Sequence, residues 1–381
     1  MPQHLDKKQT PLQSPGVSPT TTGRGTPSLP ATPERYPEAV RYPIRLDYLH
    51  TMTDDTGLIQ HGIGGIPDLA TGYTTDDNVR AFLAMVRLWR ALPDQRGDFE
   101  PLMRRYLAFV TWTQKRDGEK TGFFTNFVSY DRRFLDEWGT EDCLGRCIWA
   151  LGEAVSGNLP TGCALAVRML YNRAVPRLFR VHSPRALAYA LLGLTHTPRQ
   201  NREVMRYCAD VLLDVYRTYS HENWRWFEPY LTYDNARMVE AMWRVGAVLE
   251  DDECRAVAQE THAFLTQHSF GSDGLEPIGN RGWWKEGQEK ALFDQQTLEA
   301  GAYTELYHLT GDPERARLAL EWFYGRNAHR LPIYDPDTGA CYDSLTMEGE
   351  NLNQGAESVL SYLLAVATLM LPPSKKSDSV R

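Results

Sequence analysis

The sequence predicts an all-α fold of the (α/α)6 toroid class, in which six inner helices are surrounded by six outer helices. From Asp76 onward apolar residues recur with helical spacing, and strand-like alternation is scarce. The helical segments also alternate in character. One set opens with polar clusters and then turns apolar, whereas the other set is amphipathic and charged. The polar openings recur roughly every 40–65 residues, which is typical of repeated helical hairpins.

The chain is expected to divide into one domain and two tails. Residues 1–41 are rich in Pro, Thr, Ser and Gln and contain few aliphatic residues, so we expect a disordered tail. A single catalytic domain is expected over residues 42–372, and a flexible C-terminal tail over 373–381. Near the start of the domain, the Gly-rich segment 53–67 is interpreted as an ordered loop. It lacks the Gly-Lys-Ser/Thr signature of a phosphate loop.

Each helix of the toroid has a candidate segment. The inner helices, apolar on most sides and therefore interior, are predicted at 76–91, 141–155, 183–195, 233–248, 295–309 and 354–370. The outer helices, which are more amphipathic, are predicted at 44–50, 98–116, 161–179, 201–219, 251–268 and 312–327. In this arrangement all inner helices begin at one mouth, so their polar openings are expected to form one shared pocket.

Composition excludes several classes of function. The formal net charge is −8, so the chain has no basic footprint for nucleic acid. It contains no apolar run of about 18 residues, so no membrane span is expected. The first residues lack the apolar core of a secretory signal, and we expect a cytoplasmic protein.

The cysteine and histidine patterns do not indicate a metal site. The six cysteines form no CxxC pair, and no HExxH motif is present. Cys143 and Cys147 lie four positions apart on a predicted helix, a spacing that would allow a metal pair, but reduced buried thiols are the simpler interpretation. We therefore expect neither a catalytic metal nor a cofactor.

The densest polar opening is the stretch from Thr71 to Arg80, and a weaker copy runs from Leu231 to Met238. Acid–arginine pairs recur at these helix starts, although a positive charge near a helix N-terminus interacts unfavourably with the helix dipole. The pairs are Asp77 with Arg80, Asp142 with Arg146, and Asp234 with Arg237. Three- or four-residue spacing places both partners on one helix face. Structural braces and contacts to a substrate are equally compatible with that pattern.

Two aromatic loops add further candidates. Glu228 and Asp234 lie in a segment crowded with Trp, Tyr and Phe, where a carboxyl group tends to stay protonated and can serve as a general acid. A solvated glutamate on the rim is the alternative. Trp283 and Trp284 lie in a long irregular loop, which is typical of functional segments. They are interpreted either as a platform on which a sugar stacks or as a lid that only packs.

Several strings together resemble a known family. They are Asp55–His61, Gly72–Asn78, Glu141–Arg146, Leu231–Arg237, Pro277–Trp283, Phe293–Gln296 and Asn351–Ser358. The chain resembles helical-toroid proteins often labelled glycosyltransferase, some fused behind a group 1 glycosyltransferase domain and others encoded near β-mannoside phosphorylases. The resemblance covers nearly everything after the first tail. It implies a plan similar to (α/α)6 glycosidases and a glycosyltransferase as partner protein.

We therefore expect a carbohydrate-active enzyme, specifically a glycoside hydrolase acting on an oligosaccharide, with mannose-containing substrates as one candidate. Glycosidic cleavage needs a protonated acid and a carboxylate, and an inverting mechanism separates them by roughly 6.5–9.5 Å. The catalytic candidates are Asp77, Asp142, Glu228 and Asp234, with Glu228 or Asp234 preferred as acid and Asp77 as base. The substrate-binding candidates are His61, Asp76, Asn78, Arg80, Glu141, Arg146, Tyr233, Asn235, Arg237, Trp283, Trp284, Asp294, Gln295, Gln296, Asn353, Gln354 and Glu357.

Two other functions fit the same fold. A sugar epimerase or isomerase is expected to use two histidines on opposite sides of the sugar ring, and among the motif residues only His61 is a histidine, which itself also fits a structural role. A glycan-binding module without catalytic activity, acting beside a glycosyltransferase, is the second alternative.

Overall fold

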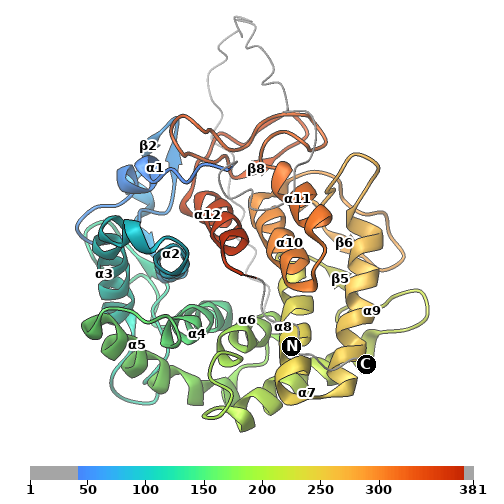
Figure 1. The fold of residues 1–381 in the computed structure, drawn as a ribbon, viewed down its shortest axis with the longest axis horizontal. Helices are drawn as coiled ribbons and strands as arrows, with labels where there is room; N and C mark the ends of the chain where they lie inside the picture. Colours follow the sequence, from blue (N-terminus) through green and yellow to red (C-terminus); the bar gives the residue numbers. More distant parts are fainter. Residues whose placement is uncertain (1–41, 373–381) are drawn as a thin grey trace, which may run out of the picture. The chain divides into compact units, whose positions relative to one another are not determined.

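Six inner and six outer helices build the part of the chain that the structure describes, residues 42–372 of a computed structural model (Figure 1). The tails predicted at 1–41 and 373–381 lie outside the described residues. The inner helices are α2 (Thr75–Ala91), α4 (Glu141–Val155), α6 (Pro184–Leu194), α8 (Asn235–Leu249), α10 (Thr297–Thr310) and α12 (Ala356–Met370). The outer helices are α1 (Asp47–Thr51), α3 (Arg96–Thr113), α5 (Thr161–Ala174), α7 (Arg202–Tyr219), α9 (Asp252–Ser269) and α11 (Pro313–Glu321).

The inner helices form a closed ring. Each packs against the next one in sequence, and α12 packs against α2 (Figure 1). Helices α3, α5, α7, α9 and α11 each cover the inner helix that precedes them. The predicted (α/α)6 toroid is confirmed in this part of the chain, and each predicted helix has its counterpart.

Two outer helices end earlier than predicted, each shortly before a proline or a glycine. Helix α5 ends at Ala174 because Pro176 has no N–H to donate, and the chain continues as the 3₁₀ helix η4 (Val175–Arg180). Helix α11 ends at Glu321, shortly before Gly325 takes a φ of 96° that an α-helix cannot contain. Two further 3₁₀ turns are η2 (Leu69–Thr71) and η3 (Pro93–Gln95).

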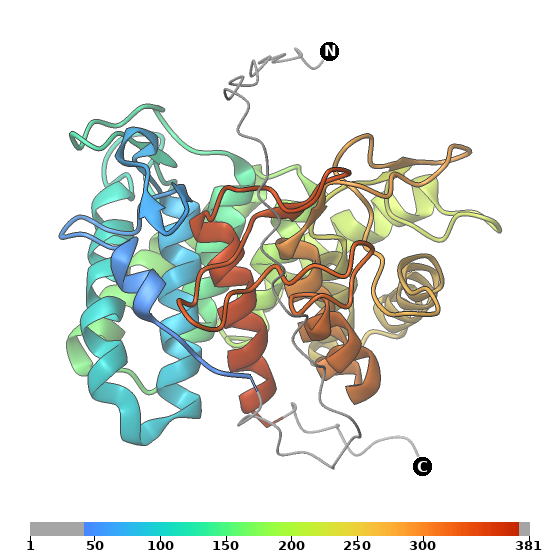
Figure 2. The same ribbon diagram turned by 90° about the horizontal axis from the view of Figure 1, so that it is seen from above.

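Short antiparallel strand pairs stiffen the loops that lead into the inner helices. The pairs are β1 (Gly62–Ile63) with β2 (Ile66–Pro67), β3 (Tyr73–Thr74) with β4 (Phe127–Val128), β5 (Tyr230–Leu231) with β6 (Trp284–Lys285), and β7 (Gln295–Gln296) with β8 (Ser344–Leu345). Strand β3 leads directly into α2, and β7 leads directly into α10. Figure 2 shows these loops gathered on one side of the ring, so one rim carries the segments that precede the inner helices.

Helices α4 and α6 approach each other through glycine. A Cβ atom built on Gly193 would lie 2.1 Å from the carbonyl oxygen of Ile148, and one on Gly145 would lie 2.3 Å from that of Ala186. Any side chain at these two positions would push the helices apart. The two glycines therefore set the spacing of one side of the ring.

The axis of the ring is filled by charged side chains as well as apolar ones. Arg87 on α2 contacts Glu153 on α4 at 2.9 Å and Glu305 on α10 at 2.5 Å. Arg237 on α8 contacts the same Glu305 at 2.6 Å and Glu240 at 2.7 Å. The arginines lower the pKa of Glu153 and of Glu305 to about 2 against the effect of burial. The buried charges are thus paired between helices.

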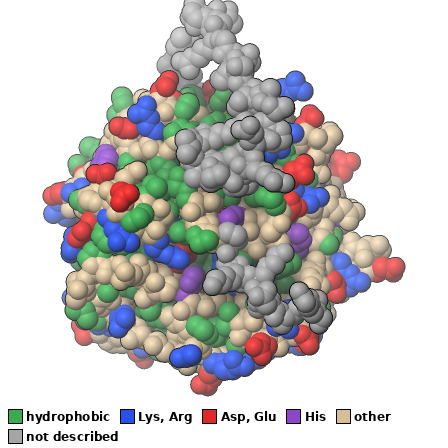
Figure 3. Space-filling model, in the orientation of Figure 1, with side chains coloured by type: hydrophobic (Ala, Val, Ile, Leu, Met, Phe, Trp, Pro, Cys, Tyr) green, Lys and Arg blue, Asp and Glu red, His purple; other side chains and the backbone are tan. Residues whose placement is uncertain are grey.

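The surface of the described residues mixes both signs of charge. Figure 3 shows acidic and basic side chains interspersed on the visible face. All six cysteines are buried and free. Over residues 42–372, no helix combines the length and the apolar character that crossing a membrane requires.

Candidate active site

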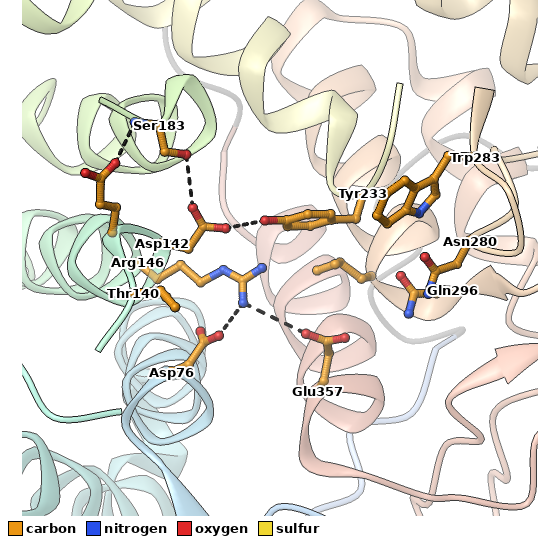
Figure 4. Close-up of a pocket in the computed structure, with 12 residues that line it drawn as sticks. Asp76, Thr140, Asp142, Arg146, Ser183, Tyr233, Asn280, Trp283, Gln296 and Glu357 are labelled. Atoms are coloured by element: carbon orange, nitrogen blue, oxygen red, sulfur yellow. Dashed lines mark hydrogen bonds and ion pairs between the residues drawn. The ribbon is translucent and has the colours of Figure 1, made fainter. Parts of the chain in front are cut away.

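A pocket of about 640 Å³ opens where the inner helices begin, and all six of these helices or the residues just before them contribute to it (Figure 4). Its lining residues are Asp76, Thr140, Glu141, Asp142, Arg146, Ser183, Tyr233, Asn280, Trp283, Gln296, Leu298 and Glu357. The helix N-termini of a toroid therefore converge here, as the polar openings of the sequence predict.

Helix capping orients several lining residues. The hydroxyl of Thr140 accepts a hydrogen bond from the backbone N–H of Cys143, and the hydroxyl of Ser183 does the same for Ala186. These N-caps fix the first turns of α4 and α6. They hold Glu141 and Asp142 at the pocket wall, where Glu141 also accepts hydrogen bonds from the backbone N–H groups before α6.

Arg146 occupies the centre of the pocket floor. Its Nη1 atom lies 2.5 Å from the Asp76 carboxylate and 3.9 Å from Glu357 (Figure 4). The nearest oxygens of these two carboxylates are therefore no farther apart than the sum of the two distances, about 6.4 Å. The Nη2 atom donates to the Tyr189 hydroxyl at 3.0 Å. One guanidinium thus links side chains from four inner helices.

Arg80, on α2, forms a second cluster of ion pairs beneath the pocket lining. It contacts Asp77 at 2.8 Å, Glu357 at 3.0 Å and Asp76 at 3.3 Å. Asp77 is buried, and its carboxylate also accepts a hydrogen bond from the Thr74 hydroxyl at 2.6 Å. Burial raises the pKa of Asp77 to about 6, since the charges of Asp76 and Glu357 offset part of the stabilisation by Arg80. The Asp77 carboxyl therefore retains its proton into the weakly acidic range.

Asp142 has different neighbours, since its hydrogen-bond donors are hydroxyl groups. The Tyr233 hydroxyl donates to one carboxylate oxygen at 2.5 Å, and Ser183 donates to the other at 3.3 Å. In Figure 4 Asp142 lies on the opposite side of the Arg146 guanidinium from Asp76 and Glu357. Carboxylates therefore lie on two sides of the pocket.

Aromatic and amide side chains complete the wall. The Tyr233 ring is covered by the Arg185 guanidinium, 4.6 Å from the ring centre, and Arg185 is held by Glu228 at 3.2 Å. Trp283 reaches the pocket from a loop and has a φ of 56°, a left-handed conformation that is rare for a large side chain. Asn280 and Gln296 lie beside it (Figure 4).

Of the residues predicted from sequence, eight line the pocket, and they come from six separate segments of the chain. These residues are Asp76, Glu141, Asp142, Arg146, Tyr233, Trp283, Gln296 and Glu357. Among the four predicted catalytic residues, only Asp142 is in the lining. Asp77 lies beneath it with Arg80, Asp234 is buried with Arg237, and Glu228 is buried against Arg185.

The predicted amide side chains at the starts of α2 and α8 hydrogen-bond to the backbone of the segments that precede these helices. Asn78 bonds to the backbone of Leu58 and Thr74, and Asn235 bonds to both backbone groups of Thr232. Both amides are fully buried and lie outside the pocket lining.

Other predicted residues also contact protein groups rather than the pocket. Gln295 accepts from the Trp322 indole at 3.0 Å, and the backbone carbonyl of Asp294 accepts from Asn280. Trp284 packs against Trp224, Phe264 and His268. Two further contacts fasten α12 to the Gly-rich loop: His61 with Asn353, at 2.8 Å, and Gln354 with the Gly65 N–H, at 2.7 Å.

Four lining residues were not predicted as site residues. They are Thr140, Ser183, Asn280 and Leu298. The two hydroxyl residues carry a recognisable signal, because each stands at the N-cap of a predicted inner helix. Asn280 lies in the string Pro277–Trp283, which marks the segment but not this residue. Leu298 carries no signal, because its place in the lining follows from how α10 lies in space. Among residues 42–372, no group of three or more His, Cys, Asp or Glu side chains is arranged to hold a metal ion.

No family model and no curated protein matches this sequence, but solved structures do. A cellobiose 2-epimerase from Bacillus thermoamylovorans is 10% identical with a TM-score of 0.65, covering 87% of this chain and 96% of that one. A D-mannose isomerase is 13% identical with a TM-score of 0.62, covering 85% and 93%. An α-1,6-mannanase of Salegentibacter, solved as an inactive variant with α-1,6-mannotetrose, is 10% identical with a TM-score of 0.57, covering 85% and 95%. These likenesses show that the chain has the (α/α)6 toroid fold.

Proposed function

We propose that this protein is a carbohydrate-active enzyme, specifically a glycoside hydrolase that cleaves an oligosaccharide in the pocket of the toroid. The observation that carries the proposal is the placement of carboxylates on two sides of one cavity, with Asp142 on one side and Asp76 and Glu357 on the other. A volume of about 640 Å³ is in the range of small-molecule sites. Trp283, Asn280 and Gln296 supply a ring for stacking and amides for sugar hydroxyls.

Asp142 is assigned as the base that activates water. Its two donors, Tyr233 and Ser183, are hydroxyl groups that orient the carboxylate. A carboxylate held in this way can take a proton from water while the water attacks the anomeric carbon.

The acid is assigned to the cluster on the other side of the cavity. Asp76, Asp77 and Glu357 share two guanidinium groups, and the pKa of Asp77 is raised to about 6 by burial. Coupled carboxyl groups titrate as a unit, so the proton belongs to the cluster rather than to one residue. Glu357 is its most exposed member, with 37% of its side chain accessible, and passes the proton to the leaving oxygen. This assignment keeps Asp77 in the proton-holding cluster and replaces Glu228 and Asp234 by Asp142, Asp76 and Glu357, which line the pocket.

The fold neighbours support this choice of reaction class. The mannanase variant described as inactive has two consecutive aspartates replaced by alanine. This chain also carries two consecutive aspartates, of which Asp76 lines the pocket and Asp77 is buried beneath it. Mannose-containing oligosaccharides are therefore included among the first substrates to test. An inverting outcome and a glycosyltransferase partner remain predictions.

A sugar epimerase or isomerase is the second candidate, favoured by the likeness to the cellobiose 2-epimerase and the D-mannose isomerase. Such a reaction needs a base that removes a proton from carbon next to a carbonyl and a group that returns it. The pocket lining contains no histidine, and His61 is engaged by Asn353. Hydrolysis by paired carboxyl groups fits the lining better.

The test is incubation with manno-, gluco- and xylo-oligosaccharides, with product chromatography for bond cleavage and NMR for the anomer released. We expect new reducing ends, and we expect Asp142→Asn to reduce turnover at least a thousandfold while the protein stays folded. Asp252→Asn, at an exposed position on α9, is the matched control. A changed sugar of unchanged size would establish epimerisation instead, and binding without any product would establish a glycan-binding module.

A further inference from the structure

Helix α8 begins in an unusual way. Asp234, at its N-cap, has φ 52° and ψ 37° and makes no side-chain capping bond. This left-handed conformation is uncommon for residues other than glycine, although aspartate adopts it more readily than most. The backbone N–H of Asp234 donates instead to the carboxyl group of Glu299, which comes from the neighbouring inner helix α10. Glu299 therefore caps a helix to which it does not belong.

The capped peptide group directly follows Tyr233, whose hydroxyl reaches Asp142. The carboxylate of Asp234 is fixed from another side by the Tyr189 hydroxyl at 2.6 Å. The turn that presents Tyr233 is thus held at its N–H by α10 and at its carboxylate by α6. Arg185 covers the ring but does not constrain the peptide group.

We propose that Glu299 is a positioning residue, which holds the turn at Tyr233 and Asp234 so that the Tyr233 hydroxyl stays on the Asp142 carboxylate. Glu299 is only 1% exposed and is outside the pocket lining, so it acts through Tyr233 and not on the substrate. Its second oxygen, Oε2, is buried and has no hydrogen-bond partner among residues 42–372. The contacts that Glu299 makes are therefore with the backbone at the start of α8.

The protonation of Glu299 suits this role. Burial and the nearby Asp234 charge raise the pKa of Glu299 to about 8, so the group is neutral at the pH where most enzymes work. A neutral acceptor fixes the Asp234 N–H without adding a charge under the pocket. Glutamine has the same shape and the same acceptor, whereas leucine has a similar volume and no acceptor.

The inference rests on the proposed function, because it assigns Glu299 a role in keeping Asp142 competent as base. The kinetic test compares Glu299→Leu, Glu299→Gln and Tyr233→Phe. We expect Tyr233→Phe to lower kcat while KM changes little, because Asp142 loses the hydroxyl group that orients it. Glu299→Leu should likewise lower kcat by about tenfold with little change in KM, and Glu299→Gln should restore kcat.

The double variant separates positioning from a general structural role. If Glu299 acts through Tyr233, adding Glu299→Leu to Tyr233→Phe should cost little further activity. Independent losses that multiply, or a Glu299→Leu variant with an unchanged kcat, would overturn the proposal.

A crystal structure of Glu299→Leu tests the positioning without any substrate. We expect the Tyr233 hydroxyl to have moved away from Asp142, and an unchanged hydrogen bond would overturn the inference. This outcome does not depend on whether the protein is a hydrolase. If the unaltered protein cleaves no sugar, the proposed function fails. A displaced Tyr233 in Glu299→Leu would still establish that Glu299 positions this tyrosine.

Discussion

The Nη1 atom of Arg146 lies 2.5 Å from the carboxylate of Asp76, which joins the first turns of two neighbouring inner helices at the pocket floor. Both side chains are largely buried, and Glu357 approaches the same nitrogen. Removing one partner from such a cluster leaves uncompensated charge in a poorly solvated place.

Replacement of Arg146 by methionine is therefore expected to destabilise the protein by about 3–5 kcal/mol, the usual range for breaking a buried ion pair from one side. Chemical denaturation followed by circular dichroism measures the change. Arg104→Met is the matched control, because its pair with Glu100 lies on the exposed face of α3 and should contribute less than about 1 kcal/mol. Equal effects of the two changes would show that the buried network is not a source of stability.

Activity is expected to fall as the pH rises through about 6. Burial raises the pKa of Asp77 to about 6, so Asp77 loses its proton in that range and can no longer supply it for the leaving group. Asp77→Asn removes this titrating group, so the fall in activity near pH 6 should be absent from its profile. A pH–rate profile of both proteins gives the answer. Loss of folding in Asp77→Asn would show instead that Asp77 is a structural brace.

The two adjacent tryptophans are expected to respond differently to replacement by alanine. Trp283 lines the pocket, so Trp283→Ala should raise KM or weaken oligosaccharide binding by about tenfold, which corresponds to about 1.4 kcal/mol of binding free energy. Trp284 packs on Trp224 and Phe264, so Trp284→Ala should lower the thermal midpoint by several degrees. Calorimetric titration and thermal unfolding of both variants distinguish the roles. The interpretation would be wrong if both variants lost only stability.

Gly193→Ala is expected to destabilise the toroid, although alanine normally favours a helix. The new methyl group would lie 2.1 Å from the backbone oxygen of Ile148, and the two helices would have to separate, at a cost of about 1–3 kcal/mol. Gly162→Ala on α5 is the control, because its nearest neighbouring atom would lie 3.8 Å away. That change should be neutral or stabilise by up to about 1 kcal/mol. If both variants shifted the urea midpoint of unfolding in the same direction, the close approach of α4 and α6 would be contradicted.

The helices and the common mouth could be predicted from sequence because both depend on local patterns. Apolar periodicity marks α2 and α4, and polar N-terminal clusters mark where they begin. The side of the helix or strand on which one residue points is harder to predict. Asp76 lines the pocket and Asp77 does not, because successive residues of a helix point about 100° apart.

The same limit separates residues in the loops. Gln295 and Gln296 form β7, in which neighbouring side chains face opposite ways, so one bonds Trp322 and the other reaches the pocket. No sequence pattern says which is which. Glu299 was missed for another reason, because it resembles any first-turn acid and its partner, the Asp234 N–H, lies 65 positions away.

The ion pairs along the axis have a consequence for how the ring comes together. Arg87, Glu153, Arg237 and Glu305 come from four helices spread over most of the described chain, so no contiguous half of it contains a complete set of partners. A fragment that stops before α10 lacks Glu305. Arg237 and Arg87 would each lose this partner while still surrounded by apolar side chains. Cutting the gene into halves should therefore give two insoluble pieces rather than two stable lobes, and co-expression of both pieces should be needed to recover a soluble product.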